Sequence, residues 1–293
     1  MGMIDRALKV TVASGKGGTG KTFFSTNFAL ALSEKYRVVL ADLDVEEPND
    51  SIFFDNKCVV TIPQYKSVPR VIEESCINCG LCSRVCNFGA IISIPNKIVV
   101  FDNLCHSCYA CSELCPSGAI KMEDYYIGDI NKNRVSETLL LVEGRIDTKE
   151  EQSVPMIEGV KNFVNLIKKE ENYDLAIFDS PPGTSCPMIS AVKDSDYIIF
   201  ITEPTEFGLN DLRLAIETAI LLKKSFGVVI NRYEKSDNCV ERYCNETDVD
   251  IIAKVPYDKE IAYNYSNGNL CNSYFKEDML QNIINRVNRN GKA

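Results

Sequence analysis

The segment Gly15–Thr22 constrains the fold more than any other stretch of this chain. Its sequence, GKGGTGKT, fits the phosphate-loop pattern G-x-x-x-x-G-K-[ST]. An apolar run, Leu8–Ala13, precedes it, and a helix-like run, Thr22–Glu34, follows it. In this order of strand, loop and helix, backbone N–H groups and a helix N-terminus together hold a phosphate chain. The segment therefore predicts a nucleotide site in an α/β domain, and a Gly-rich turn without a ligand is the alternative.

Each residue type in the loop has a physical role in that prediction. Glycines let the backbone curl so that several N–H groups point at one phosphate chain. We expect Lys21 to reach the β- and γ-phosphates and the hydroxyl of Thr22 to bind Mg²⁺. Lys16 places a second lysine at the other end of the loop, and the simplest alternative for it is a solvated side chain. The predicted nucleotide-binding residues of the loop are Gly15, Gly17, Gly18, Thr19, Gly20, Lys21 and Thr22.

Strand-like and helix-like segments alternate on both sides of a cysteine-rich stretch. Continuous runs of Val, Ile and Leu are typical of parallel strands that are buried on both faces. The predicted strands are Leu8–Ala13, Arg37–Asp44, Tyr173–Asp179, Asp196–Glu203, Phe226–Asn231 and Asp250–Val255, and the predicted helices are Thr22–Glu34, Val154–Glu171, Phe207–Lys224 and Phe275–Arg289. Residues 123–154 suggest a connecting hairpin or meander that turns at Gly128 and Gly144. We therefore predict a mostly parallel α/β fold of the P-loop NTPase type.

Polar side chains stand where three of these strands end. Asp42 and Asp44 end the second strand, Asp179 ends the third, and Asn231 follows the apolar run FGVVI. The carboxyl ends of parallel strands are where α/β sheets place their ligands. We expect the carboxylate of Asp179 to hold Mg²⁺ through water. The alternative is that a strand-end Asp or Asn serves only as a cap or turn residue.

Eight cysteines between residues 63 and 122 form an internal repeat. The spacing C-x₂-C-x₂-C-x₃-C occurs at Cys76, Cys79, Cys82 and Cys86, and again 29 positions later at Cys105, Cys108, Cys111 and Cys115. The tripeptide Gly-Ala-Ile at 89–91 recurs at 118–120 with the same displacement. A duplicated half-module explains both coincidences.

The spacing is that of bacterial two-cluster [4Fe–4S] ferredoxins, in which the fourth cysteine of each run ligates the other cluster. On this rule cluster one takes Cys76, Cys79, Cys82 and Cys115, and cluster two takes Cys105, Cys108, Cys111 and Cys86. Two zinc sites are the alternative, but zinc prefers paired C-x₂-C knuckles that a longer loop separates. We expect an inserted α+β domain of the bacterial ferredoxin type. His106 is expected to be a loop residue near a cluster, and Asn87 stands where the pattern has proline.

Composition limits the partners. The chain has 293 residues and a net charge of −9, and its scattered Lys and Arg residues argue against nucleic acid and against a stable membrane anchor. No apolar run approaches the roughly 20 residues of a membrane helix, and residues 1–9 do not resemble a signal peptide. We therefore expect a cytoplasmic protein whose thirteen cysteines serve metal or redox chemistry.

The predicted domains are 63–122 for the insert and 1–62 with 123–293 for the ATPase domain.

Taken together, the motifs resemble the MinD superfamily of P-loop ATPases, the Mrp/MinD group of the SIMIBI class, in the form with an inserted ferredoxin domain. The resemblance covers nearly the full length and rests on GKGGTGKT, ADLDVEEPN, the two cysteine runs, DSPPGTSCP and ITEPTEFGLNDL. It implies a deviant Walker A loop and a homodimer in which Lys16 reaches the partner's phosphates. It also implies that Asp44 orients or activates the attacking water, that Asp42 supports the metal side, and that Asn231 reads adenine. Lys16, Lys21 and Asp44 are therefore the predicted catalytic residues of an Mg²⁺-dependent ATPase.

Two functions fit these parts. In the first, ATP binding and hydrolysis gate electron transfer through the two clusters to a partner protein. In the second, the chain is a carrier or scaffold of the Mrp kind for iron–sulfur or metal-cofactor assembly, and Cys186 helps to hold a labile cluster. A weaker third option is a positioning ATPase in which the clusters are structural. The remaining cysteines are Cys58, Cys186, Cys239, Cys244 and Cys271, for which burial as small apolar side chains is the alternative.

Overall fold

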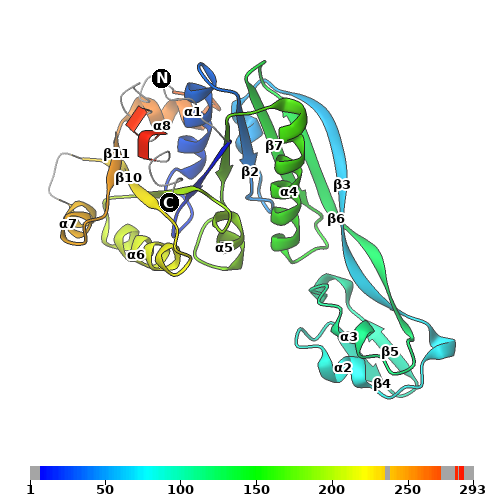
Figure 1. Ribbon diagram of the computed structural model, residues 1–293. Coiled ribbons are helices and arrows are strands. Elements are labelled where there is room, and N and C mark those ends of the chain that lie inside the picture. The colour runs from blue at the N-terminus through cyan, green and yellow to red at the C-terminus, as the bar shows by residue number, and fades with distance from the viewer. Residues whose placement is uncertain (1–6, 235–237, 272–280, 283, 287–293) are drawn as a thin grey trace.

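A nine-stranded sheet organises the chain in the computed structural model, which describes residues 7–234, 238–271, 281–282 and 284–286 (Figure 1). The strands lie in the order β11-β10-β9-β1-β8-β2-β7-β6-β3. Those from β11 to β7 are parallel, whereas β6 and β3 are antiparallel to their neighbours. Their bounds are β1 Leu8–Ala13, β2 Val38–Asp42, β3 Lys57–Val71, β6 Ile120–Arg134, β7 Leu139–Ile146, β8 Leu175–Asp179, β9 Tyr197–Thr202, β10 Phe226–Tyr233 and β11 Ile251–Pro256.

Helices cover both faces of the parallel strands, because alternate residues of each strand point to opposite faces. Leu40 and Ile177 pack with Phe24 of α1, whereas Val39 and Phe178 pack on α4. The helices are α1 Lys21–Ser33, α4 Ser153–Glu171, α5 Cys186–Val192, α6 Glu206–Leu221, α7 Cys239–Glu246 and α8 Lys259–Ser266. The predicted mostly parallel α/β fold of the P-loop NTPase type is confirmed. No helix in the described ranges is both long and apolar enough to cross a membrane.

Strands β3 and β6 form a two-stranded arm that the sequence did not reveal. They pair along their whole length, from Lys57 opposite Arg134 to Val71 opposite Ile120. One half of β6 also pairs with β7, and the other half leaves the sheet with β3 and reaches the cysteine-rich part (Figure 1). The expected boundaries at 62/63 and 122/123 therefore fall inside strands. We call residues 72–119, which lie beyond this arm, the cysteine module.

The expectation that Gly128 and Gly144 form turns is wrong. Gly128 lies in β6 with a φ of 141°, where a Cβ atom would stand 2.2 Å from the carbonyl oxygen of Arg145. Gly144 lies in β7, where a Cβ atom would stand 2.5 Å from Val160. Both glycines therefore permit close approach inside the sheet. The predicted helix Phe275–Arg289 lies outside the described residues except for 281–282 and 284–286.

The cysteine module repeats its backbone as well as its cysteines. Its elements are the 3₁₀ turns η2 Glu73–Ser75 and η3 Asp102–Leu104, the helices α2 Leu81–Val85 and α3 Ala110–Glu113, and the hairpin β4 Ile91–Ile94 and β5 Lys97–Val100. Left-handed residues recur 29 positions apart, at 78 and 107, 80 and 109, and 89 and 118. The N–H of Ile72 donates to Ala119 at 2.8 Å, and the equivalent N–H of Phe101 donates to Ala90 at 2.8 Å. The two halves thus bond to each other reciprocally, as a duplicated unit requires.

Candidate functional site

The loop between β1 and α1 has the shape that the phosphate motif predicts. Gly20 precedes α1 in a left-handed conformation with a φ of 94°, and Lys21 is the first helical residue. Gly15 approaches α6 so closely that a Cβ atom would stand 2.2 Å from the carbonyl oxygen of Asp211. The hydroxyl of Thr19 is buried without a hydrogen-bond partner. The loop thus leaves polar groups available at the N-terminus of a 13-residue helix.

Buried acids stand beside this loop. Asp42 and Asp179 end adjacent strands and are opposite each other in the register of β2 and β8. The Thr22 hydroxyl donates to Oδ2 of Asp179 at 3.0 Å, and Oδ1 of Asp179 is buried without a partner. Asp50, which the sequence analysis missed, is fully buried against the carboxyl group of Asp179, and neither of its carboxylate oxygens accepts a bond from an N–H or hydroxyl group. Burial raises the pKa values of Asp42, Asp50 and Asp179, and the charges of neighbouring acids raise those of Asp42 and Asp50 further.

These acids fit Mg²⁺. Magnesium is typically held by one or two carboxylates together with waters and substrate phosphates. Thr22, Asp179 and Asp50 present a hydroxyl and unpartnered carboxylate oxygens at the end of the phosphate loop. A divalent cation would favour the charged forms of these carboxyl groups, which burial disfavours and, at Asp50, the neighbouring acids disfavour further. Within the described ranges, no three His, Cys, Asp or Glu side chains could hold a metal ion by themselves.

Asp42 and Asp44 are placed differently from each other. Both carboxylate oxygens of Asp42 accept backbone N–H bonds, from Asp44 at 2.9 Å, Asn49 at 2.8 Å and Asp50 at 3.1 Å. Asp42 therefore fixes the loop that follows β2. Asp44 is half-buried, and burial raises its pKa to about 6, with a further contribution from Asp179 that Lys21 opposes. A carboxyl group that titrates this close to neutrality suits a base that positions water.

Lys16 and Asn231 are both engaged within the chain. The Nζ atom of Lys16 lies 3.5 Å from Oε2 of Glu203, whose other oxygen pairs with Arg232. The Asn231 amide donates to the Thr19 carbonyl at 2.8 Å and accepts from the backbone N–H of Arg232 at 2.9 Å. Asn231 therefore anchors the phosphate loop to the end of β10.

A pocket of about 380 Å³ opens beside Asn231. Gly18 and Gly20 of the phosphate loop line one side of it, and Phe23, Tyr257 and Tyr265 supply aromatic rings. Its position next to the phosphate loop and its aromatic lining suit a purine base. The two tyrosines follow the last strand, and their place after a strand end is the only signal that the sequence offered for them.

The cysteine module holds two cavities of equal size. Each has a volume of about 20 Å³. The cysteines that line one cavity are Cys76, Cys79, Cys82 and Cys115, and those that line the other are Cys105, Cys108, Cys111 and Cys86. The fourth cysteine of each run thus faces the triplet of the other run. His106 lines the second cavity and stacks on Phe88, with ring centroids 3.8 Å apart.

The module has little core apart from these cysteines. Its buried apolar side chains include Ala90 and Ile91, and they pack directly on the thiols. Burial raises the pKa of Cys111 to about 11 and also raises the pKa values of Cys82 and Cys105. A bound metal would displace these protons and replace the missing core. The four thiols at each cavity match a [4Fe–4S] cluster in the number and type of its ligands, whereas no three of the described thiols form a site for a single metal ion.

The other five cysteines lie outside both cavities. Cys186 is exposed at the start of α5, and Cys58 is exposed in β3. Cys239 is half-buried, whereas Cys244 and Cys271 are buried. Burial raises the pKa of Cys244 to about 11, as expected for a packed apolar thiol. All thirteen cysteines are free of disulfides.

Comparison with known proteins places this architecture. A family model described as the CobQ/CobB/MinD/ParA nucleotide binding domain matches residues 10–271. The protein MJ0578 of Methanocaldococcus jannaschii is 37% identical over 227 residues, which are 77% of this chain and 78% of that protein. The chain belongs to the CobQ/CobB/MinD/ParA family of nucleotide-binding domains.

Two solved structures of MinD proteins have a similar fold, and a relative more distant than MJ0578 is known from its sequence. The MinD cell division protein of Aquifex aeolicus is 19% identical, with a TM-score of 0.56 over 97% of this chain and 96% of its own. The MinD protein of Pyrococcus horikoshii, whose structure is a complex with Mg-ADP, is 19% identical, with a TM-score of 0.54 over 97% and 95%. A Brugia malayi homologue of the cytosolic Fe–S cluster assembly factor NUBP1 is 24% identical over 87% of this chain and 71% of its own.

Proposed function

We propose that this protein is an ATP-hydrolysing iron–sulfur protein in which the nucleotide state gates electron transfer through two [4Fe–4S] clusters to a partner protein. The observation that carries the proposal is the pair of equal cavities, each lined by three cysteines of one run and the fourth cysteine of the other. This crossed arrangement is the ligation pattern of two-cluster ferredoxins. Membership of the nucleotide-binding family supports the ATPase part.

At the nucleotide site, the chain's own residues would bind and orient. The backbone N–H groups of the loop and the Lys21 ammonium would hold the phosphates, and the pocket beside Asn231 would take the base. Thr22 and Asp179, with Asp50 beside them, would hold Mg²⁺, which neutralises charge on the phosphates when it is bound. Asp44 would accept a proton from, or orient, the attacking water.

Dimer formation would release Lys16. Its present partner, Glu203, also pairs with Arg232, so that Arg232 keeps this carboxylate paired when Lys16 leaves. Lys16 has a third of its side chain exposed and could then reach a partner subunit's phosphates. A homodimer of this kind is part of the proposal, as is a cytoplasmic location with no nucleic acid and no membrane anchor.

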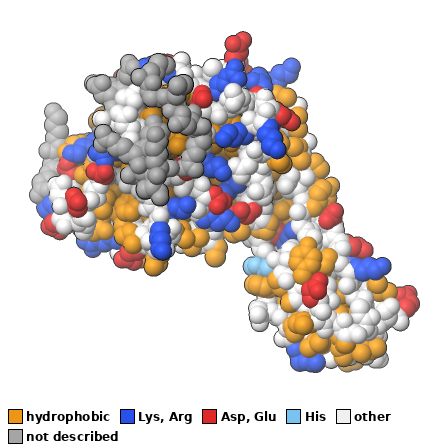
Figure 2. All heavy atoms as spheres, viewed as in Figure 1, with side chains coloured by type: hydrophobic (Ala, Val, Ile, Leu, Met, Phe, Trp, Pro, Cys, Tyr) orange, Lys and Arg blue, Asp and Glu red, His pale blue; other side chains and the backbone are white. Residues whose placement is uncertain are grey.

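The module offers a surface for a redox partner. The module exposes the apolar side chains of Ile77, Phe88, Ile92, Ile94, Phe101, Tyr109 and Leu114. Among them, Ile77 lines one cavity, and Phe88 and Tyr109 line the other. Figure 2 shows orange apolar patches across the module face turned to the viewer. Electron transfer needs only a short-lived contact near the clusters, and small surfaces of this kind suit weak redox encounters.

The second candidate is a carrier or scaffold in iron–sulfur or metal-cofactor assembly. The resemblance to a homologue of a cytosolic Fe–S cluster assembly factor favours it. The exposed thiol of Cys186, at the end of the loop that follows Asp179, could help to hold a cluster in transit.

An anaerobic preparation separates the two candidates. The redox function predicts about eight irons per chain that stay bound through ATP turnover. It also predicts that the rate of cluster reduction by dithionite differs between ADP and a non-hydrolysable ATP analogue, and that Lys21→Ala abolishes the difference. The carrier function predicts instead that iron and sulfide move to an apo-ferredoxin and that Cys186→Ala stops the transfer. A chain that binds zinc and no iron would refute both.

A further inference from the structure

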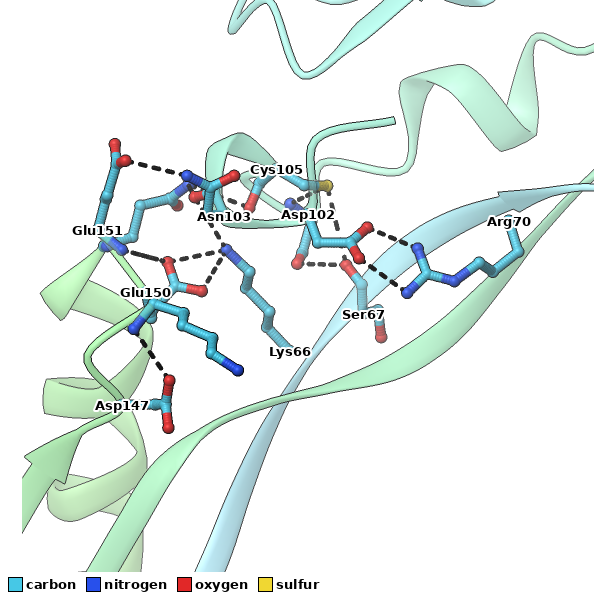
Figure 3. Close-up of polar contacts among 12 residues, drawn as sticks. Lys66, Ser67, Arg70, Asp102, Asn103, Cys105, Asp147, Glu150 and Glu151 are labelled. Carbon is cyan, nitrogen blue, oxygen red and sulfur yellow. Dashed lines mark hydrogen bonds and ion pairs between the residues drawn. The ribbon is translucent and has the colours of Figure 1, made fainter. Parts of the chain in front are cut away.

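One short segment, Asp147–Gln152, touches both the nucleotide domain and the loop that carries Cys105. It joins β7 to α4 and lies against η3 of the cysteine module (Figure 3). The side chain of Gln152 donates to the carbonyl oxygens of Asn103 at 3.0 Å and Cys105 at 3.2 Å. The Asn103 amide donates in return to Glu151 at 2.9 Å.

At the centre of this contact is a buried ion pair. The Nζ atom of Lys66 lies 2.9 Å from Oε1 and 2.7 Å from Oε2 of Glu150, and the two side chains are only 2% and 1% exposed. Lys66 also donates to the Asn103 carbonyl at 3.4 Å. Oε1 of Glu150 accepts the backbone N–H groups of Glu151 at 3.1 Å and Gln152 at 2.9 Å. The ion pair therefore fixes the segment, the arm strand β3 and the Cys105 loop to one another.

The segment is also tied to the loop after Asp44. The N–H of Ile146 donates to the carbonyl of Val45 at 3.0 Å, directly before the segment begins. Gly144 lies in contact distance of Val45 and Val160, so that the end of β7 packs tightly between that loop and α4.

Helix α4 ties the same segment to the loop after Asp179. Lys161 of α4 is 4% exposed, donates to the Ser190 carbonyl on α5, and lies 2.7 Å from Asp194. Glu158 of α4 accepts from the Ser190 hydroxyl. Because α5 directly follows residues 180–185, a movement of that loop would carry α5 and α4 with it.

We propose that Asp147–Gln152 and Lys66 form a coupling joint that transmits the nucleotide state to the Cys105 side of the module. The loop after Asp44 reaches this joint through β7, and the loop after Asp179 reaches it through α4. Loops of this type change order with the γ-phosphate, which supplies the two states that coupling requires. The inference rests on the proposed function and assigns Glu150, Gln152 and Lys66 as positioning residues for cluster two.

Amide hydrogen exchange, with and without Mg²⁺ and a non-hydrolysable ATP analogue, tests the joint without requiring turnover. The N–H groups of Leu104 and Cys105 are hydrogen-bonded to Phe101 and Asp102, so their exchange is measurable. In the parent protein we expect the analogue to slow exchange in the phosphate loop and to change exchange at residues 104–105 by about fivefold or more, the low end of usual coupling between sites.

Two variants and a control separate the possible failures. Glu150→Gln and Gln152→Leu should keep the phosphate-loop response and the iron content but lose the response at 104–105. Gln152→Leu leaves the Lys66–Glu150 ion pair intact, so this variant still tests the joint if Glu150→Gln does not fold. Glu171→Gln, at the other end of α4, removes a carboxylate that pairs with Lys132 on β6, and it should respond like the parent. If both joint variants keep the change in amide exchange at residues 104–105, the coupling joint is refuted, while control of the module by the nucleotide state stands. If the parent protein itself shows no change at these residues, the proposed control by the nucleotide state fails as well.

Discussion

Replacing Glu150 by Gln tests the energetics of the buried pair with Lys66. Gln retains Oε1, which accepts the N–H groups of Glu151 and Gln152, so the substitution removes charge and little else. Lys66 would then be a buried ammonium without a charged partner, since the retained Oε1 at 2.9 Å, the Asn103 carbonyl at 3.4 Å and the Tyr125 ring at 5.8 Å carry no net charge. Breaking one side of a buried pair costs about 3–5 kcal/mol.

The expected loss corresponds to a fall in melting temperature of roughly 6–20 °C, at about 2–4 °C per kcal/mol for a chain of this size class. Circular dichroism melts of the anaerobic protein measure it. Lys66→Met combined with Glu150→Gln leaves neither charge buried and should recover most of the loss. Asp250→Asn is the control: its side chain is 58% exposed and that of its partner Arg286 is 35% exposed, and we expect a change of about 1 kcal/mol or less. A single variant that melts within about 2 °C of the parent, or a double variant as unstable as the single one, would refute the reasoning.

Four further outcomes follow from the geometry. Cys86→Ser should remove cluster two and about half of roughly eight irons, although Cys86 belongs to the first run; iron and sulfide assays with EPR check this. Gly20→Ala forces a side chain into φ 94° and should weaken nucleotide binding about tenfold in calorimetry. Because the pKa of Asp44 is about 6, hydrolysis should fall as the pH drops through 6, and Asp44→Asn should be slow at every pH with unchanged nucleotide affinity. Because the pKa values of Asp50 and Asp179 are raised in the folded state, the protein loses stability as the pH rises and these carboxyl groups lose their protons. A bound cation offsets that loss, so Mg²⁺ with nucleotide should raise the melting temperature more at pH 8 than at pH 5.

The strands and helices of the nucleotide domain could be predicted because their signals are local. The predicted strand Leu8–Ala13 matches β1 at both ends, and Val154–Glu171 differs from α4 by one residue at its start. Gly128 was misinterpreted because a glycine signals either a turn or a close approach, and only the neighbouring backbone at Arg145 distinguishes the two. The arm was missed for a related reason, since its strands carry polar residues and pair mostly with each other.

The site residues, too, divide into those that a local sequence motif reveals and those that depend on distant parts of the chain. Lys21 and Thr22 were found because the phosphate motif is contiguous. Asp50 was missed because nothing in its neighbourhood in the sequence reveals that it is buried next to Asp179. That Asn231 reads a base stays a prediction; in the structure Asn231 lines the pocket beside the phosphate loop, and its amide is bonded to Thr19 and Arg232.

The sequence by itself determined the nucleotide loop, the parallel α/β pattern and the division of the eight cysteines into two crossed sets, because contiguous motifs and fixed spacings carry that information. Only the tertiary structure decided how the module is attached and what it touches. Lys66 and Glu150 are 84 residues apart, and their pairing depends on the pairing of β3 with β6 and on the packing of α4 against the sheet. Contacts at that separation depend on the register and packing of the whole sheet, which no local pattern encodes.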